Sequence, residues 1–283
     1  MNLFNIFSDL EAKDPEFSER ISPRRDAIKN MTGFGAKVAM AAMPMALGSL
    51  LKKAYGQSAS GAVEVLNYAL TLEYLEYHFY NHAVVVSNSM ISGAGGSAAL
   101  GAITTIRDHE KAHVDLLAGA IKQANGTPVS FKYEDFDFTA GGTFPTVYSD
   151  YKTFLAVANA FEDTGVRAYK GRATDILGTD YLTVALQIHS VEARHASHIR
   201  QMRKAPAGGG LNIKPWITGA NDTGVSQVDA VYKGEDNVLQ AKIDITTLAG
   251  VNGNISKSAA QESFDEPLTK EEVLAIAGLF IRK

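Results

Sequence analysis

Two segments of the chain carry the same pair of possible metal ligands, a glutamate followed three residues later by a histidine. The pairs are Glu110 with His113 and Glu192 with His195. Because residues three apart on an α-helix point the same way, both side chains of a pair can reach one cation. Two further segments each supply a lone glutamate with a tyrosine seven residues later: Glu73 with Tyr80 and Glu162 with Tyr169. The same series therefore occurs twice along the chain: first a lone glutamate, then a Glu-x-x-His pair.

Each of the four glutamates stands in a row of apolar residues that recurs at helical spacing. Glu73, for example, continues the row of Leu66 and Leu70, where another leucine would be expected. Glutamate is almost never buried without a partner, because the loss of its hydration costs several kcal/mol or more. Four such burials in one core are tolerable only if a shared cation neutralises them. The alternative is a structural role, with the glutamates paired to nearby arginines such as Arg107 or Arg194.

The donor types indicate which ions the site would favour. Carboxylates and imidazoles suit Fe(II) or Mn(II), while the absence of sulfur ligands disfavours Zn(II) and Cu(I). The 283 residues include no cysteine, so disulfides and thiolate metal sites are both excluded. Replacing Glu162 or Glu192 by Gln is expected to weaken metal binding but to leave the metal-free protein no less stable, because clustered carboxylates repel one another.

The elements that must position these residues are four long helices. Apolar periodicity places them at about 62–87, 97–123, 146–178, and from Thr179 or Asp180 to just before Pro206. Short links join the first helix to the second and the third to the fourth, whereas a longer, turn-rich segment that includes 127–145 joins the second to the third. This connectivity is typical of an all-α four-helix bundle with one long crossover.

The remaining tail, 205–283, is expected to pack on the bundle, which itself covers residues 61–204. Segments 228–232 and 238–245 could form short strands or docked loops. The run from Thr269 to Glu272 has the pattern of a capping box and predicts a final short helix that reaches Phe280.

Several polar residues beside the ligand rows have more than one possible role. Tyr80 and Tyr169 could fill the core, donate a hydrogen bond to a ligand, or act in redox chemistry. Glu76 lies about 60° round the helix from Glu73 and could be a further ligand, although a solvated or supporting carboxylate is favoured. Three histidines beside the ligand face could support the ligands: His109, His189 and His198. Two others, His78 and His82, are expected at the surface.

Three runs of residues carry a resemblance to a known family: 66–76 with Phe79 and Tyr80 after it, 160–166, and 264–269 in the tail. On these runs, residues 61–204 resemble a ferritin-like domain of the group that contains desiccation-related and stress-induced proteins. The resemblance implies a ferritin-like four-helix bundle with an irregular C-terminal tail. It also implies a dinuclear metal site with the ligands Glu73, Glu110, His113, Glu162, Glu192 and His195. Four carboxylate charges would balance two divalent ions, Fe or Mn.

Residues 1–60 are expected to form an export signal rather than part of the fold. Arg24 and Arg25 precede an apolar stretch at 31–51, and small residues follow at 58–60. The paired arginines resemble a twin-arginine signal, which implies export of the folded, metal-loaded protein to the periplasm or another extracytoplasmic compartment, with cleavage near 57–61. The alternative is an uncleaved amphipathic or membrane-anchoring helix, since this stretch is long enough to span a bilayer. Lys37 and the glycines and proline within the stretch disfavour a stable span.

Two functions from different classes remain open. The first is an oxidoreductase that uses oxygen or peroxide, by Fe(II) oxidation or by peroxide removal, of which a manganese catalase is a narrower version. The second is a non-catalytic stress or structural protein whose ions hold the bundle together. Storage in a ferritin cage is not expected, because the long tail replaces the short final helix of such cages. The formal charge of -4 gives no basic field for nucleic acid, and a homo-oligomer is possible.

Overall fold

The computed structural model describes residues 59–251 and 253–282. The predicted leader, residues 1–60, lies outside the described residues except for Ala59 and Ser60, which begin the first described helix. Export and cleavage therefore stay predictions.

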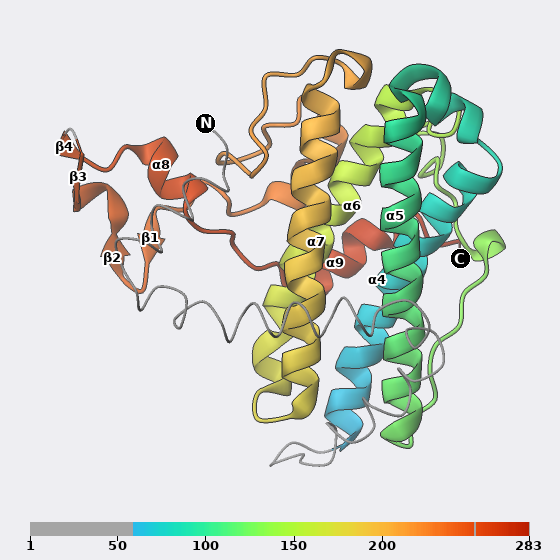
Figure 1. Ribbon diagram of the computed structural model, residues 1–283. Coiled ribbons are helices and arrows are strands. Elements are labelled where there is room, and N and C mark those ends of the chain that lie inside the picture. Colours follow the sequence, from blue (N-terminus) through green and yellow to red (C-terminus); the bar gives the residue numbers. More distant parts are fainter. Residues whose placement is uncertain (1–58, 252, 283) are drawn as a thin grey trace, which may run out of the picture. The chain divides into compact units, whose positions relative to one another are not determined.

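Four long helices form the bundle (Figure 1). Their bounds are Ala59–Val85 for α4, Asn88–Gln123 for α5, Tyr151–Arg172 for α6 and Asp180–Lys204 for α7. Helix α4 packs mainly against α5, and α6 packs mainly against α7. The segment between α5 and α6 runs along the length of the bundle and joins the two pairs. The predicted four-helix bundle with one long crossover is confirmed.

The start of α6 lies five residues beyond the predicted position near Thr146. Asp150 caps the helix, because its carboxylate accepts a hydrogen bond from the Thr153 amide at 2.7 Å. The cap satisfies an amide that has no partner within the helix, and it therefore sets the first helical residue at Tyr151.

The link between the first two helices is shorter than the sequence predicted. Residues 88–95 are already helical, and the break falls within α5 at Gly96, where φ is 77°. This backbone region is costly for residues with a side chain, so glycine suits the kink. The prediction that residues 93–96 form the link was wrong because only one of these glycines leaves the helical conformation.

No described helix is by itself long and apolar enough to cross a membrane. Helices α4 and α5 reach that length and hydropathy only together, as a pair bent by 86°.

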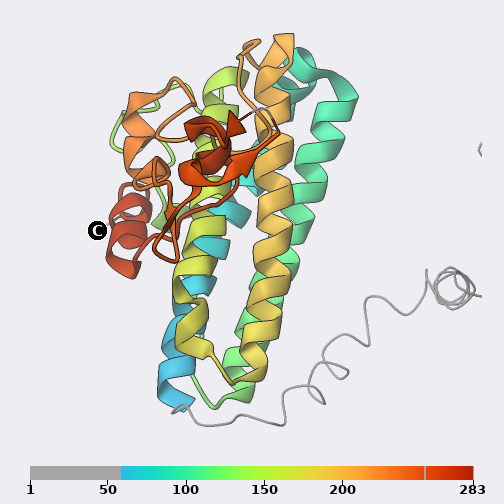
Figure 2. The same cartoon turned by 90° about the vertical axis from the view of Figure 1, so that its left-hand side faces the viewer.

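The C-terminal extension, residues 205–282, lies across α6 and α7 (Figure 2). It contains two small antiparallel hairpins, β1 with β2 and β3 with β4, and several short helices. In the first hairpin Leu239 pairs with Asp244. The bounds are η3 Pro206–Gly208, η4 Ser226–Tyr232, β1 Leu239–Gln240, β2 Ile243–Asp244, η5 Ile245–Thr247, β3 Ala249–Gly250, β4 Gly253–Asn254, α8 Lys257–Glu262 and α9 Lys270–Ala277.

The structure settles the expectations for this extension. Segment 228–232 belongs to the 3-10 helix η4, whereas 238–245 contains the β1–β2 hairpin. Helix α8 was not predicted. The capping box was predicted and is present: the Thr269 hydroxyl accepts from the Glu272 amide, and the Glu272 carboxylate accepts from the Thr269 amide. The helix that it opens ends at Ala277 rather than at the predicted Phe280.

The bundle core consists of two apolar clusters. One contains Leu72, Phe79 and Phe154, and the other contains Leu70, Leu117 and Ile188. On each bundle helix the predicted ligand glutamate falls between residues of the two clusters, as Glu192 does between Ile188 and Ile199. A layer of polar side chains therefore divides the core.

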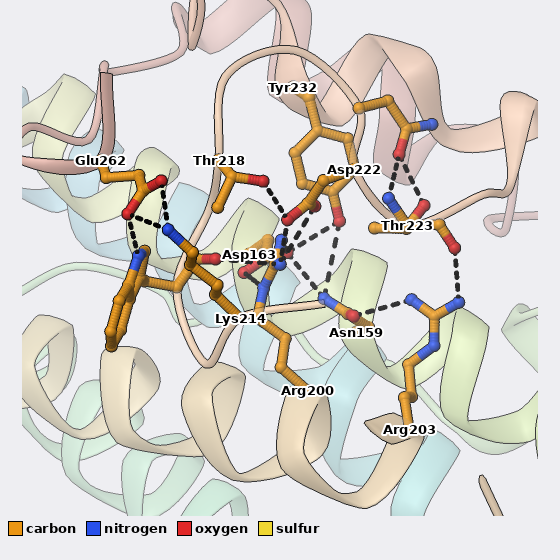
Figure 3. Close-up of polar contacts among 12 residues, drawn as sticks. Asn159, Asp163, Arg200, Arg203, Lys214, Thr218, Asp222, Thr223, Tyr232 and Glu262 are labelled. Carbon is orange, nitrogen blue, oxygen red and sulfur yellow. Dashed lines mark hydrogen bonds and ion pairs between the residues drawn. The ribbon is translucent and has the colours of Figure 1, made fainter. Parts of the chain in front are cut away.

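A buried polar network attaches the extension to the bundle (Figure 3). Asp163 of α6 accepts from Arg200 of α7 at 2.8 Å and from the hydroxyl of Tyr232 in η4 at 2.7 Å. Arg200 also pairs with Asp222 at 3.0 Å. Next to them, Arg203 donates to Asn159 of α6 at 2.8 Å and to the Thr223 carbonyl at 2.9 Å. The extension is therefore joined to two bundle helices by charge as well as by apolar packing.

Arg167 forms a second attachment from α6. Its fully buried guanidinium donates to the carbonyls of Val231, Lys233 and Glu266. It also pairs with Glu235 at 2.9 Å. Three carbonyls and one carboxylate from two segments of the extension, 231–235 and Glu266, therefore converge on a single side chain of the bundle.

We predict that Arg200→Met destabilises the protein by about 3–5 kcal/mol, because it leaves Asp163 buried without its ionic partner. Lys111→Ala is the control, since it removes an exposed pair with Asp115 on α5 and should change the free energy of unfolding by less than about 0.5 kcal/mol. Chemical denaturation of the full chain measures both. Equal, small changes would show that the network does not stabilise the fold.

Candidate metal centre

The six predicted ligands come together in the layer that separates the two apolar clusters. Helix α4 supplies one, α5 two, α6 one and α7 two: Glu73, Glu110, His113, Glu162, Glu192 and His195. All four glutamates are 0% exposed, and the two histidines are 8% and 5% exposed. Each of the four bundle helices thus directs one or two of these side chains into the same buried layer.

The six residues form two overlapping donor sets. The first set is Glu73, Glu110, His113 and Glu192, and the second is Glu110, Glu162, Glu192 and His195. Within each set, one donor atom from every residue lies within 4.8 Å of the others. Glu110 and Glu192 belong to both sets, so these two carboxylates are placed to bridge two neighbouring cation positions.

The contacts of His113 show why protons alone do not satisfy the layer. Its Nδ1 lies 3.1 Å from a carboxylate oxygen of Glu73, of Glu110 and of Glu192. A ring nitrogen carries at most one hydrogen, which cannot serve three acceptors at once.

His195 repeats this arrangement in the second set. Its Nδ1 lies 2.9 Å from Glu110, 3.1 Å from Glu192 and 3.3 Å from Glu162. Buried oxygens remain without a hydrogen bond on Glu110, Glu162 and Glu192. A divalent cation accepts several such donors at once, so the donor set fits Fe(II) or Mn(II).

The carboxylates of the layer differ in the direction in which their surroundings shift their pKa values. Burial raises the pKa of Glu162 to about 7. Burial and repulsion from Glu192 raise the pKa of Glu110 well above its usual range. For Glu192 burial acts in the same direction, but the hydrogen bonds from His113 and His195 outweigh it and lower the pKa to about 2. Of Glu110, Glu162 and Glu192, only Glu192 has a pKa below its usual range when no cation is bound.

The two predicted tyrosines bind ligands across the bundle. The Tyr80 hydroxyl on α4 donates to Glu162 on α6 at 2.5 Å. The Tyr169 hydroxyl on α6 donates to Glu73 on α4. Burial, followed by the neighbouring glutamate, raises the pKa of each tyrosine well above its usual range. The tyrosine of α4 thus orients the glutamate of α6, and the tyrosine of α6 orients the glutamate of α4. A redox role for these tyrosines stays a prediction.

His109 supports the second donor set from outside. Its Nδ1 lies 2.9 Å from Nε2 of His195. When His109 accepts at this nitrogen, His195 carries a proton on Nε2, and its Nδ1 could then offer a lone pair to a cation held among the carboxylates. Such outer hydrogen bonds orient ligand imidazoles.

The other histidines belong to neither donor set. His189 is half-buried and His198 is exposed. His78 approaches the Phe131 carbonyl at 2.9 Å, and His82 stacks on Tyr133.

The sequence favoured a solvated or a supporting carboxylate at Glu76; the solvated role is wrong, because the side chain is buried, and the supporting role stays a prediction. It is 3% exposed, and burial and the nearby ligand glutamates, Glu192 first, raise its pKa well above its usual range. The space it occupies depends on Gly165 of α6, where a Cβ atom would come within 3.2 Å of Glu76 Oε1. Glu76 belongs to neither donor set. It is a fifth buried carboxylate beside the layer.

The alternative that arginines neutralise the glutamates is not what the structure shows. Arg107 pairs with Asp108 and donates to Asn81. Arg194 is exposed. Among the described residues, the ion pairs of the four ligand glutamates are all with His113 and His195.

Sequence reasoning missed a row of polar residues on another side of α6, about 100° round the helix from Glu162. Asn159, Asp163 and Arg167 follow one another at intervals of four, which places them in one row along the helix. Such a row on an otherwise apolar helix predicts a second polar contact surface. The extension provides that surface.

We predict that Tyr80→Phe and Tyr169→Phe each weaken Mn(II) binding by about tenfold or more, because loss of an outer partner of a ligand typically costs 10–100-fold in affinity. Tyr68→Phe is the matched control, since it removes a buried hydroxyl that has no hydrogen-bond partner. Calorimetric titration measures the affinities. Unchanged affinity in all three variants would exclude this orienting role.

We predict opposite effects of Glu162→Gln and Glu192→Gln on the chelated protein at pH 8. The raised pKa of Glu162 means that the folded state holds its proton more tightly, so wild-type stability falls as the pH rises from about 4.5 to about 7. Glu162→Gln removes that loss and should stabilise the fold by on the order of 2 kcal/mol.

The lowered pKa of Glu192 stabilises the fold above pH 4.5, and this contribution is lost as the pH falls towards 2. Glu192→Gln should therefore destabilise, contrary to the expectation from sequence.

Thermal unfolding with chelator and with Mn(II) measures both variants. With Mn(II), each should gain less stability than wild type, because a cation has lost a neutralising partner. Equal losses with and without metal in both variants would contradict the metal centre.

Comparison with known proteins agrees with this geometry. The family model for the ferritin-like domain matches residues 61–205, which include all four bundle helices' ligands. A search of the curated proteins finds no match to the chain. The matched region covers more than half of the chain and contains every residue of the two donor sets. The chain belongs to the ferritin-like domain family.

Proposed function

We propose that the protein binds two divalent ions, Fe or Mn, one in each donor set, and uses them for oxidation by oxygen or peroxide. The observation that carries the proposal is the pair of overlapping sets that share Glu110 and Glu192. A single ion would need only one set. Two sets with two common carboxylates match the arrangement by which carboxylate bundles hold a pair of ions.

Charge supports two ions rather than one. The four carboxylates of the donor sets carry four negative charges when ionised, and two divalent ions balance them with the imidazoles neutral, while the raised pKa of Glu76 favours its uncharged form. In a low-dielectric interior an unbalanced charge is costly, so a neutral centre is the favourable filling.

The donor sets and the residues around them suit a metal centre that reacts with a small oxidant. Bound Fe or Mn would supply one-electron redox chemistry and positions for a small oxidant. Each set offers a single imidazole with carboxylates, fewer donors than the six that Mn(II) commonly accepts. Tyr80 and Tyr169 hold two of the carboxylates in place, and burial of all six ligands limits the entry of water.

A second candidate function is structural. The donor sets draw residues from all four helices, so bound ions would join the two halves of the bundle. In that case the ions would stabilise the fold without turnover, as expected of a metal-binding stress protein.

We predict that the two donor sets lose metal independently. Wild type should retain about two equivalents of Mn(II) or Fe(II) per chain by analogy with carboxylate bundles. His113→Ala should lose the ion of the first set alone, because His113 belongs only to that set. Glu110→Gln should lose or weaken both, since Glu110 is shared. Elemental analysis after loading and gel filtration measures the content. Identical losses in the two variants would argue against separate ion positions.

Turnover assays separate the two functions. Loaded wild type should consume oxygen with Fe(II) or remove peroxide, and Glu110→Gln should not. Full metal content with no reaction towards either oxidant would favour the structural function.

A further inference from the structure

A cleft of about 440 Å³ opens where the start of α6, the end of α7 and the extension meet. Residues 143–146 of the crossover, the first two turns of α6, and the turns around Gly209 and Gly224 line it. Of the residues described around it, none belongs to either donor set. Small-molecule sites usually measure about 300–1,000 Å³. The cleft therefore has room for a ligand and is separate from the metal centre.

The charged side chains that line the cleft are both basic, Lys152 and Arg203. Arg203 is 3% exposed, and its guanidinium donates to the Asn159 side chain and to the Thr223 carbonyl (Figure 3). A guanidinium has five N–H groups, so these two bonds leave others free for a ligand. In the part of the chain that the structure describes, neither Lys152 nor Arg203 forms an ion pair, because the nearby aspartates of the network bind Arg200 instead.

The two arginines of this network differ in how well their charge is compensated. Burial acts to lower the pKa of Arg200, but Asp163, to which it is bonded, outweighs burial and raises the pKa. Burial lowers the pKa of Arg203, and the attraction of Tyr232 and the aspartates does not reverse the shift. A buried cation without a bonded carboxylate is stabilised by an added anion. The cleft gives an anion access to this guanidinium.

The threonines of the cleft indicate what the rest of the ligand carries. Three of their hydroxyls already donate the hydrogen to an oxygen of the protein, at 2.6–2.8 Å: Thr143, Thr153 and Thr223. A hydroxyl has one hydrogen and two lone pairs, so these oxygens can accept from a ligand but no longer donate to it. They therefore suit a ligand that has hydroxyl groups of its own.

We propose that this cleft binds a small hydroxylated anion, a sugar or polyol that carries one phosphate or carboxylate group. Lys152 and Arg203 bind the anionic group, and the threonine oxygens accept hydrogen bonds from the hydroxyl groups of the ligand. The stem of Lys152 lies beside the turn at Gly209, where an added Cβ would come within 4.0 Å of Lys152 Cδ. The side chain thus runs along the wall of the cleft. This site does not depend on the proposed metal chemistry.

Calorimetric titration of the full chain with glucose 6-phosphate and with gluconate tests the proposal. Glucose lacks the charge and inorganic phosphate lacks the sugar hydroxyls, so these two serve as comparison probes. Each titration is run on the metal-loaded chain and on the chelated chain.

Two variants and one control locate the binding. Lys152→Glu reverses an exposed charge on the wall, and it should fold because glutamate is favoured in the first turn of a helix. Thr143→Val removes one exposed acceptor oxygen without a change of charge. Lys122→Glu is the matched control, because Lys122 is also an exposed lysine near a helix end but does not border the cleft.

We expect one or both of the hydroxylated anions to bind wild type and Lys122→Glu with equal affinity, with or without metal. Lys152→Glu should bind them about tenfold or more weakly, because an attraction becomes a repulsion. Thr143→Val should bind them a few-fold more weakly and leave the affinity for inorganic phosphate unchanged. The anion that binds more tightly shows whether phosphate or carboxylate is the charged group.

Four results would overturn the proposal. Neither anion binds wild type, or Lys152→Glu binds as tightly as wild type. Glucose or inorganic phosphate binds as tightly as the hydroxylated anions. Binding disappears when the metal is removed, which would place the anion at the donor sets.

Discussion

The burial of four carboxylates and two imidazoles in one layer is the constraint on which the rest of this fold depends. Each carboxylate has lost its hydration, and the two histidines cannot provide enough hydrogens to satisfy the oxygens around them. The apolar clusters on either side pack the helices together, and the polar layer between them could hold a metal ion. Divalent cations have the charge and the coordination number for such a layer.

The two halves of the bundle support each other at this layer. Tyr80 of α4 holds Glu162 of α6, and Tyr169 of α6 holds Glu73 of α4. On the outer side of α6, Asp163 and Arg167 bind the extension. Since Asp163 directly follows Glu162, one helix is held both by the ligand layer and by the network that attaches the extension. The extension thus contacts the same helix that carries Glu162.

Much of the bundle and its centre could be predicted from the sequence, because local spacing encodes them. Glu110 with His113 shares one face of one helix, and an acidic residue within an apolar row signals burial wherever the row packs. Contacts between distant segments leave weaker signals. The burial of Glu76 depends on the missing side chain of Gly165 on another helix. The partner of Asp163, Tyr232, lies 69 residues away in a segment without a clear period. The sharing of Glu110 and Glu192 between two sets required the relative placement of all four helices.

The most direct test of a two-ion centre is a crystal structure of the Mn(II)- or Fe(II)-loaded protein with anomalous scattering measured at the metal edge. We predict two anomalous peaks about 3.5–4 Å apart, the separation usual for paired metal sites, with Glu110 and Glu192 between them. The first peak would lie beside His113 and the second beside His195. A single peak within the layer, or peaks only at surface residues while the layer stays free of metal, would contradict it.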